Sequence, residues 1–93
     1  MKSILSNERE CYVCGAKSPL HRHHIFHGSA NRRLSEEYGC WVYLCAHHHN
    51  ASNHSVHYDH KMDIWLKAEC QERWEALFGS TDDFISVFGR SYK

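Results

Sequence analysis

The apolar residues of this chain gather in a few short runs, and their spacing changes along the sequence. Leu20–Phe26 ends in β-branched and aromatic residues, and Cys40–Cys45 is rich in residues of these types, so both segments predict strands. Residues 27–39 carry glycine, serine, asparagine and a run of charged residues, and they predict a loop that includes at most a helical turn. Two strands joined by a long polar loop are therefore expected.

Helical spacing begins after the second strand. The chain is expected to enter a helix directly after Cys45 and to break near residues 50–53, which read NASN. A long helix is predicted over about 59–78, before Gly79, because apolar residues recur there at helical spacing. The predicted buried stripe of this helix consists of Met62, Leu66, Cys70, Trp74 and Leu77.

Residues 80–83 (STDD) form a good N-terminal cap for a last short helix, which Gly89 ends. The order of strand, loop, strand, helix and helical tail is that of a small α+β protein. Residues 1–93 are expected to form a single domain, with a chemical core over about 11–60 and a helical tail over about 60–90.

Composition adds a reason to look for a metal. A chain of 93 residues has a modest hydrophobic core, and such small domains often gain stability from metals or disulfides. The 10 histidines are far above ordinary use, and an odd count of 5 cysteines disfavours a complete disulfide framework. No segment resembles a signal peptide or approaches the roughly 20 apolar residues of a membrane helix. A cytoplasmic protein with metal-binding cysteines and no membrane partner is therefore expected.

Two pairs of metal-ligating residues share one spacing, Cys11-x2-Cys14 and Cys45-x2-His48. Zinc takes four nitrogen or sulfur ligands in a tetrahedron, and three cysteines with one histidine form a common structural set. The binding energy of such a closed site contributes to folding. Buried thiols that pack as small hydrophobic residues are the alternative, but they leave the shared spacing unexplained.

The remaining cysteines are expected in the core, since Cys70 lies on the apolar helical stripe and Cys40 points to the opposite strand face from Cys45. His49 directly follows a proposed zinc ligand. Because successive helical residues diverge by about 100°, His49 is expected to face a second site.

A second dense histidine cluster, HRHHIFH, spans residues 21–27. Alternate residues of a strand face opposite sides, so His23 and His24 are expected to flank one reactive centre at the fraying end of the first strand. For His24, packing on the strand or support of a neighbouring ligand is the alternative.

The order C-x2-C, then H-H-I, then a strand ending in L-C-x2-H-H resembles the HNH, or ββα-metal, nucleases. In that superfamily a β-hairpin and a helix hold one divalent ion. The segments HHIF, LCAHHHN, VHYDH and WEALFG are most similar to a phage branch that includes recombination-enhancement nucleases acting with RecA filaments. The specific motifs cover about residues 11–60. The resemblance implies a zinc-stabilised ββα-metal fold with a C-terminal helical tail.

The resemblance also implies roles for the histidines. His24, the second of the HH pair, matches the general base that activates water. His23 and His49 match ligands of a catalytic divalent ion. A further ligand is expected downstream, at one of three positions: His57, which is preferred, Asn53 or His54.

One position departs from the family pattern. The middle asparagine of the HNH motif falls at Cys40, so Asn31 or a backbone carbonyl is expected to orient His24 instead. Arg32 and Arg33 are the expected contacts to the DNA backbone, with a solvated surface role as the alternative. Because 11 basic and 11 acidic residues balance, DNA binding depends on such a local patch or on a partner.

The expected function is therefore metal-dependent endonucleolytic hydrolysis of DNA phosphodiester bonds, in phage or prophage DNA processing or recombination. A structural Zn²⁺ and a catalytic Mg²⁺, Mn²⁺ or Zn²⁺ are the implied cofactors. DNA and a recombinase or another phage DNA-processing protein are the implied partners. The alternative is a non-catalytic, zinc-stabilised module that binds nucleic acid or protein. Such a module needs the four zinc ligands but not the second histidine set, which favours the nuclease.

Overall fold

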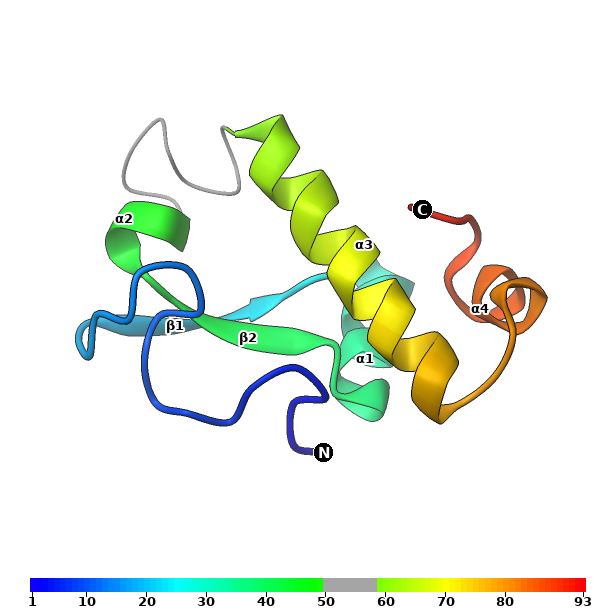
Figure 1. Cartoon of the computed structure of the whole chain (residues 1–93), viewed down its shortest axis with the longest axis horizontal. Helices are drawn as coiled ribbons and strands as arrows, with labels where there is room; N and C mark the ends of the chain where they lie inside the picture. Colours follow the sequence, from blue (N-terminus) through cyan, green and yellow to red (C-terminus); the bar gives the residue numbers. More distant parts are fainter. Residues whose placement is uncertain (50–58) are drawn as a thin grey trace.

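A computed structural model of the chain describes residues 1–49 and 59–93. In chain order its elements are β1 (Leu20–His24), α1 (Ser29–Tyr38), β2 (Trp41–Cys45), α2 (Ala46–His49), α3 (His60–Leu77) and α4 (Thr81–Phe88). β1 and β2 pair antiparallel, with His23 opposite Val42 and His24 opposite Trp41. The helix α2 follows β2 directly at one end of the strand pair, and α4 lies at the opposite end of the molecule (Figure 1).

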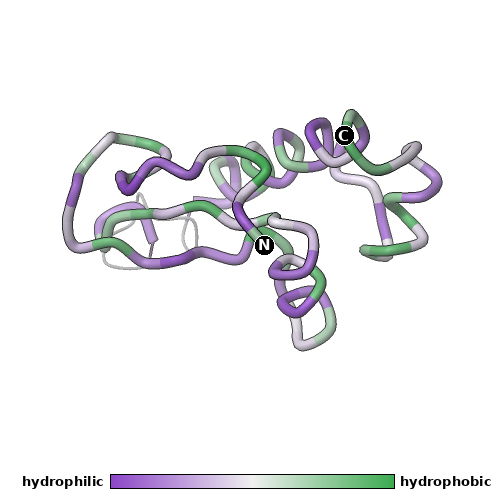
Figure 2. The backbone as a smooth tube through the Cα atoms, turned by 90° about the horizontal axis from the view of Figure 1, so that it is seen from below, coloured by the Kyte–Doolittle hydropathy of each residue, from purple (hydrophilic) through white to green (hydrophobic). Residues whose placement is uncertain are grey.

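The two predicted strands are confirmed with shorter bounds, and they differ in character. β2 is almost entirely buried, whereas in β1 His21 and Arg22 are exposed and His23 alone is buried. Figure 2 shows the same contrast as an apolar run beside a polar one. The apolar residues Ile25 and Phe26 follow β1 and are buried in the core, so the end of β1 is anchored while its histidines border the surface.

Ten residues of the segment 27–39 form the helix α1, so the prediction of a loop is wrong. Although most of its residues are polar, one side of α1 faces the core, where Leu34 and Tyr38 pack. The hydroxyl of Ser35 accepts from the N–H of Phe26 at 3.2 Å and donates to the Phe26 carbonyl at 3.1 Å. Tertiary contacts therefore stabilise a helix that local propensity alone does not indicate.

A glycine ends α1. Gly39 adopts φ 73°, and a Cβ at this position would clash with the carbonyl of Lys2. This left-handed cap returns the chain into β2 beneath the N-terminal segment, where the N–H of Ile4 donates to the carbonyl of Gly39 at 2.9 Å.

The long helix α3 is confirmed, and Asp59 caps it by accepting from two backbone N–H groups. Of the predicted stripe, Leu66, Cys70 and Trp74 are buried, whereas Leu77 is half exposed because the chain turns into α4 there. Gln71 takes an unpredicted buried place, and its side chain accepts from the N–H of Tyr92 at 2.7 Å. The C-terminal segment is thereby fastened to α3.

The last helix is also confirmed, with a reciprocal capping box between Ser80 and Asp83. Its buried rings meet the end of β1: the ring centroid of Phe26 lies 5.3 Å from that of Phe84 and 4.5 Å from that of Phe88. In the described part of the chain, none of the helices combines the length and apolar character that crossing a bilayer demands.

Candidate metal centre and histidine pocket

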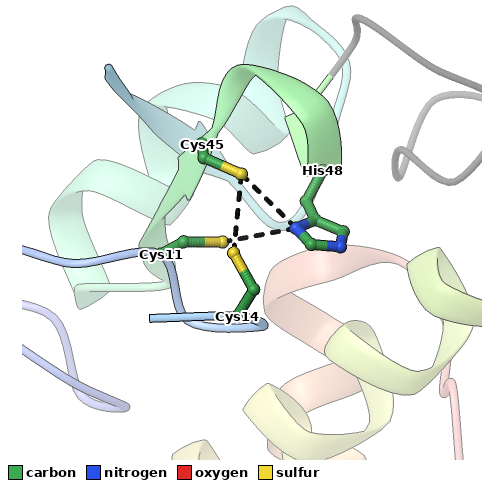
Figure 3. Close-up of side chains that lie close together, drawn as sticks. All are labelled: Cys11, Cys14, Cys45 and His48. Atoms are coloured by element: carbon green, nitrogen blue, oxygen red, sulfur yellow. Dashed lines mark hydrogen bonds between the residues drawn. The ribbon is translucent and has the colours of Figure 1, made fainter. Parts of the chain in front are cut away.

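Four predicted zinc ligands from three separate segments converge on one point (Figure 3). Cys11 and Cys14 lie in a turn near the N-terminus, Cys45 is the last residue of β2, and His48 lies in α2. The backbone N–H of Gly15 donates to the carbonyl of Cys11 at 2.9 Å, which closes the turn that carries both thiols. The predicted clustering of these ligands is confirmed.

The distances in this cluster fit zinc. Nδ1 of His48 lies 3.4 Å from Sγ of Cys45 and 3.7 Å from Sγ of Cys11. Sγ of Cys14 lies 3.7 Å from Sγ of Cys45. A zinc tetrahedron has edges of about 3.8 Å between sulfurs and about 3.5 Å between sulfur and nitrogen, from its usual bond lengths. The separations match those edges, so the four residues suit a closed, structural site.

The chemistry of Cys11 also suits a ligand. Burial opposes its thiolate, but backbone hydrogen bonds from Cys45, Cys14 and Val13 outweigh burial and lower its pKa. The thiolate is the form that binds metal, so a lowered pKa favours ligation. Cys14 is exposed and leaves a path by which an ion enters.

The two cysteines outside this cluster are core residues, as predicted. Cys40 and Cys70 are both fully buried. The hydrogen bond from Cys40, together with burial, raises the pKa of Cys70 far above its ordinary value. The Cys70 thiol therefore stays protonated, and both buried cysteines serve packing rather than ligation.

The second histidine set lines a pocket of about 310 Å³. The described residues around it are Arg22, His23, His24, His27, Arg32 and His49. They come from β1, from the segment that follows β1, from α1 and from α2. Imidazole nitrogens suit metal binding and proton transfer, and guanidinium groups suit phosphate, so the pocket combines groups whose chemistry suits an anionic ligand.

His24 has an acidic partner from α1. Its Nε2 lies 2.5 Å from Oε2 of Glu36, and Arg22 donates to the other oxygen of Glu36 at 2.8 Å. The guanidinium of Arg22 lies over the ring of Trp41, 3.7 Å from its centroid. A carboxylate that accepts this hydrogen bond would hold the proton of His24 on Nε2 and would orient the ring.

Among the described residues, the side-chain partner of His24 is Glu36 and not Asn31. The amide of Asn31 donates to the carbonyl of Phe88 at 3.4 Å and ties α1 to α4. Glu36 lies five positions after Asn31 on α1, which turns their side chains about 140° apart. If residues 27–39 formed a loop, nothing would single out Glu36 as the partner of His24. In the helix α1, Glu36 faces His24 while Asn31 faces α4.

The predicted ion ligands His23 and His49 lie at the same pocket. His23 is only 2% exposed, and its ring centroid lies 5.4 Å from that of His49 and 5.3 Å from that of His27. The ring of His49 also stacks on that of His21, at 5.0 Å. The positions considered for a further ligand lie outside the described residues: His57, Asn53 and His54.

A carboxylate from a distant part of the chain reaches this cluster. Asp63, in the first turn of α3, accepts from Nε2 of His27 at 3.2 Å and from Nζ of Lys67 at 2.8 Å. Burial would raise the pKa of Asp63, but its bonds to His27 and Lys67 outweigh burial and lower that pKa to about 2. The carboxylate is therefore ionised at neutral pH. No spacing pattern links it to a histidine 36 residues away.

The two predicted DNA-binding arginines occupy different places. Arg32 lines the histidine pocket, whereas Arg33 is exposed on α1 and lies outside the described lining. Arg22, which the sequence also offers as a contact to the DNA backbone, lines a second hollow of about 590 Å³ as well. There the guanidinium of Arg9 lies over the ring of Tyr43, 5.2 Å from its centroid.

Comparisons of the chain with protein-family models, with curated proteins and with solved structures found no match. The function is therefore inferred from the geometry of the zinc cluster and of the histidine pocket, together with the motifs in the sequence.

Proposed function

We propose that this protein is a metal-dependent endonuclease of the HNH type that hydrolyses DNA phosphodiester bonds. One observation carries the proposal: a histidine paired with a carboxylate, His24 with Glu36, borders the same pocket as three further histidines and two arginines. Phosphodiester hydrolysis needs a base for water, positive charge at the phosphate and help for the leaving oxygen. The pocket offers a residue type for each need.

His24 is the proposed general base. With the Nε2 proton directed at Glu36, Nδ1 is the basic nitrogen that remains. Nδ1 takes a proton from water as the water oxygen attacks phosphorus. The Glu36 carboxylate then faces an imidazolium and stabilises its charge, which favours the transition state.

His23 and His49 are the proposed ligands for the catalytic ion. A bound divalent ion would supply Lewis-acid stabilisation of the phosphate and of the departing 3′ oxygen. The helix α2 carries one residue of each site, because His48 meets the cysteines and His49 borders the pocket. Zinc binding at His48 therefore also holds His49 in position.

The arginines support binding of the DNA backbone. Arg22 and Arg32 border the pocket beside His24 and present guanidinium groups that pair with phosphate. Arg22 also borders the hollow that contains Arg9 and Tyr43, so a strand bound at His24 has a basic, aromatic path along which to continue. The resemblance to the phage branch adds a recombinase filament as the proposed protein partner.

A plasmid-nicking assay tests the proposed function. Supercoiled plasmid should be converted to open circles by the wild-type protein when Mg²⁺, Mn²⁺ or Zn²⁺ is added. The alternative function, a zinc-stabilised binding module, predicts that the plasmid is bound but stays intact with every ion. An intact plasmid under all these conditions would reject the nuclease.

Glu36→Gln should lower the maximal nicking rate by about ten- to a hundredfold, the usual range for a residue that orients a functional histidine. Glutamine removes the charge that stabilises the imidazolium, and its amide N–H₂ favours the wrong tautomer of His24. Single-turnover nicking measures the rate, and fluorescence anisotropy should show DNA affinity close to wild type. Glu37→Gln, on the exposed side of the same helix, is the matched control. Equal rates for the two variants would contradict the orienting role.

Arg32 and Arg33 should differ in their contribution to DNA binding. Arg32→Gln should remove one phosphate contact and reduce the slope of log K against log salt by about 1. Arg33→Gln should leave that slope unchanged, since Arg33 lies outside the described pocket lining. Anisotropy titrations in a His24→Ala background, which prevents cleavage, measure both slopes. A larger change for Arg33 than for Arg32 would reverse the assignment.

A further inference from the structure

His23, His27 and Asp63 form a group of metal-ligating side chains apart from the cysteine cluster. One ligand atom from each lies within 4.8 Å of the ligand atoms of the other two. They come from β1, from the segment after β1 and from α3. We propose that these three residues together bind one divalent transition-metal ion, and that Asp63 is its anionic ligand.

The separation between His27 and Asp63 fits a shared ion. Nε2 of His27 lies 3.2 Å from Oδ1 of Asp63. Two ligands of a tetrahedral zinc-sized ion, one nitrogen and one oxygen, lie about 3.3 Å apart from the usual bond lengths. A direct hydrogen bond and a shared ion therefore need nearly the same spacing. When the ion binds Nε2, the neutral ring of His27 carries its proton on Nδ1 instead, so no large movement is required.

The donor set indicates the class of ion. Two imidazoles and one carboxylate are the ligand set of open, three-ligand sites that bind zinc or another first-row transition ion. Mg²⁺ and Ca²⁺ prefer oxygen ligands throughout. His23 and His27 both border the 310 Å³ pocket, which leaves room at the ion for water or a phosphate oxygen.

Lys67 holds the carboxylate in a suitable orientation. Its Nζ lies 2.8 Å from Oδ2 of Asp63, and both side chains are largely buried, at 12% and 14% exposure. The other carboxylate oxygen of Asp63, Oδ1, faces His27. An outer partner of this kind commonly orients a ligating carboxylate. The lysine charge also weakens attraction for a cation, so this ion should exchange more readily than the zinc at the cysteines.

The ion would join α3 to the end of β1 and would give the proposed nuclease two ligands that the sequence motifs do not indicate. The catalytic use of this ion rests on the proposed function, whereas its binding is measured without DNA. The competing explanation is that Asp63 only pairs with His27 and Lys67 to clamp α3. That explanation predicts no ion at Asp63.

Titration of the zinc-loaded full chain with Co²⁺ distinguishes the two explanations. Wild type should bind one Co²⁺ per chain in addition to its zinc, with visible ligand-field bands but no thiolate-to-cobalt charge-transfer band. Asp63→Asn should weaken this binding at least about tenfold. Lys67→Gln removes the positive charge but keeps the carboxylate and offers an amide N–H to Oδ2, so it should bind Co²⁺ at least as tightly as wild type. Mg²⁺ should compete poorly.

Failure to bind Co²⁺ beyond the cysteine site, or equal Co²⁺ affinity in the Asp63 and Lys67 variants, would overturn the metal site. Should Asp63→Asn fail to fold, His27→Gln gives the same comparison, because it removes a second proposed ligand and leaves the Asp63–Lys67 pair. Plasmid nicking is scored separately. Normal Co²⁺ binding without nicking rejects the nuclease and keeps the site, whereas nicking without this Co²⁺ binding rejects the site and keeps the nuclease.

Discussion

His24→Ala should lower the rate of plasmid nicking by roughly 10²–10⁴-fold, the usual contribution of a general acid or base. The alanine side chain cannot accept a proton from water, and it leaves Glu36 paired with Arg22 alone in the described structure. The effect should fall on the chemical step. Binding of DNA should persist, because the arginines that border the pocket remain.

The measurement is single-turnover nicking of supercoiled plasmid with saturating divalent ion, and anisotropy reports DNA binding in parallel. His60→Ala is the matched control, since it removes an exposed histidine at the start of α3. Circular dichroism should show that both variants are folded. A His24→Ala protein that nicks as fast as wild type would show that another group activates water.

Removal of the structural zinc should unfold the protein. Structural zinc sites in small domains contribute about 10–16 kcal/mol of apparent binding free energy, whereas a whole domain is stable by only about 5–15 kcal/mol. The cluster fastens the N-terminal turn, through Cys11 and Cys14, to the end of β2 at Cys45 and to α2 at His48. Without the ion, the three cysteines of the cluster lose the bonds that connect these segments.

A strong chelator should therefore abolish the cooperative thermal transition, and added Zn²⁺ should restore it. Cys45→Ser should behave like the chelated wild type. Cys40→Ala, which changes a buried cysteine outside the cluster, should lose some stability but keep its zinc. Metal analysis should find at least one tightly held zinc per folded wild-type chain. A chain that folds fully with less zinc than this would refute the structural role of the cluster.

The helix α1 is the element that the local sequence pattern does not predict. Strands, the long helix and its caps follow from periodicity and from residues such as Asp59 and Ser80, which act on their immediate neighbours. The polar segment 27–39 carries too few apolar residues to indicate a helix. It becomes helical because Ser35 and Tyr38 find partners in the core, and a single sequence does not reveal such partners.

The sequence by itself predicted the cluster of Cys11, Cys14, Cys45 and His48, because each of its two pairs with x2 spacing brings two side chains together within a single turn of backbone. It also indicated a second set of histidines, in residues 21–27 and at His49. Only the tertiary structure decided which carboxylates complete that set. Glu36 reaches His24 across 12 residues and Asp63 reaches His27 across 36, and both contacts depend on how α1 and α3 pack against the end of β1. Spacing governs residues that share one turn, whereas packing governs residues that meet from separate elements.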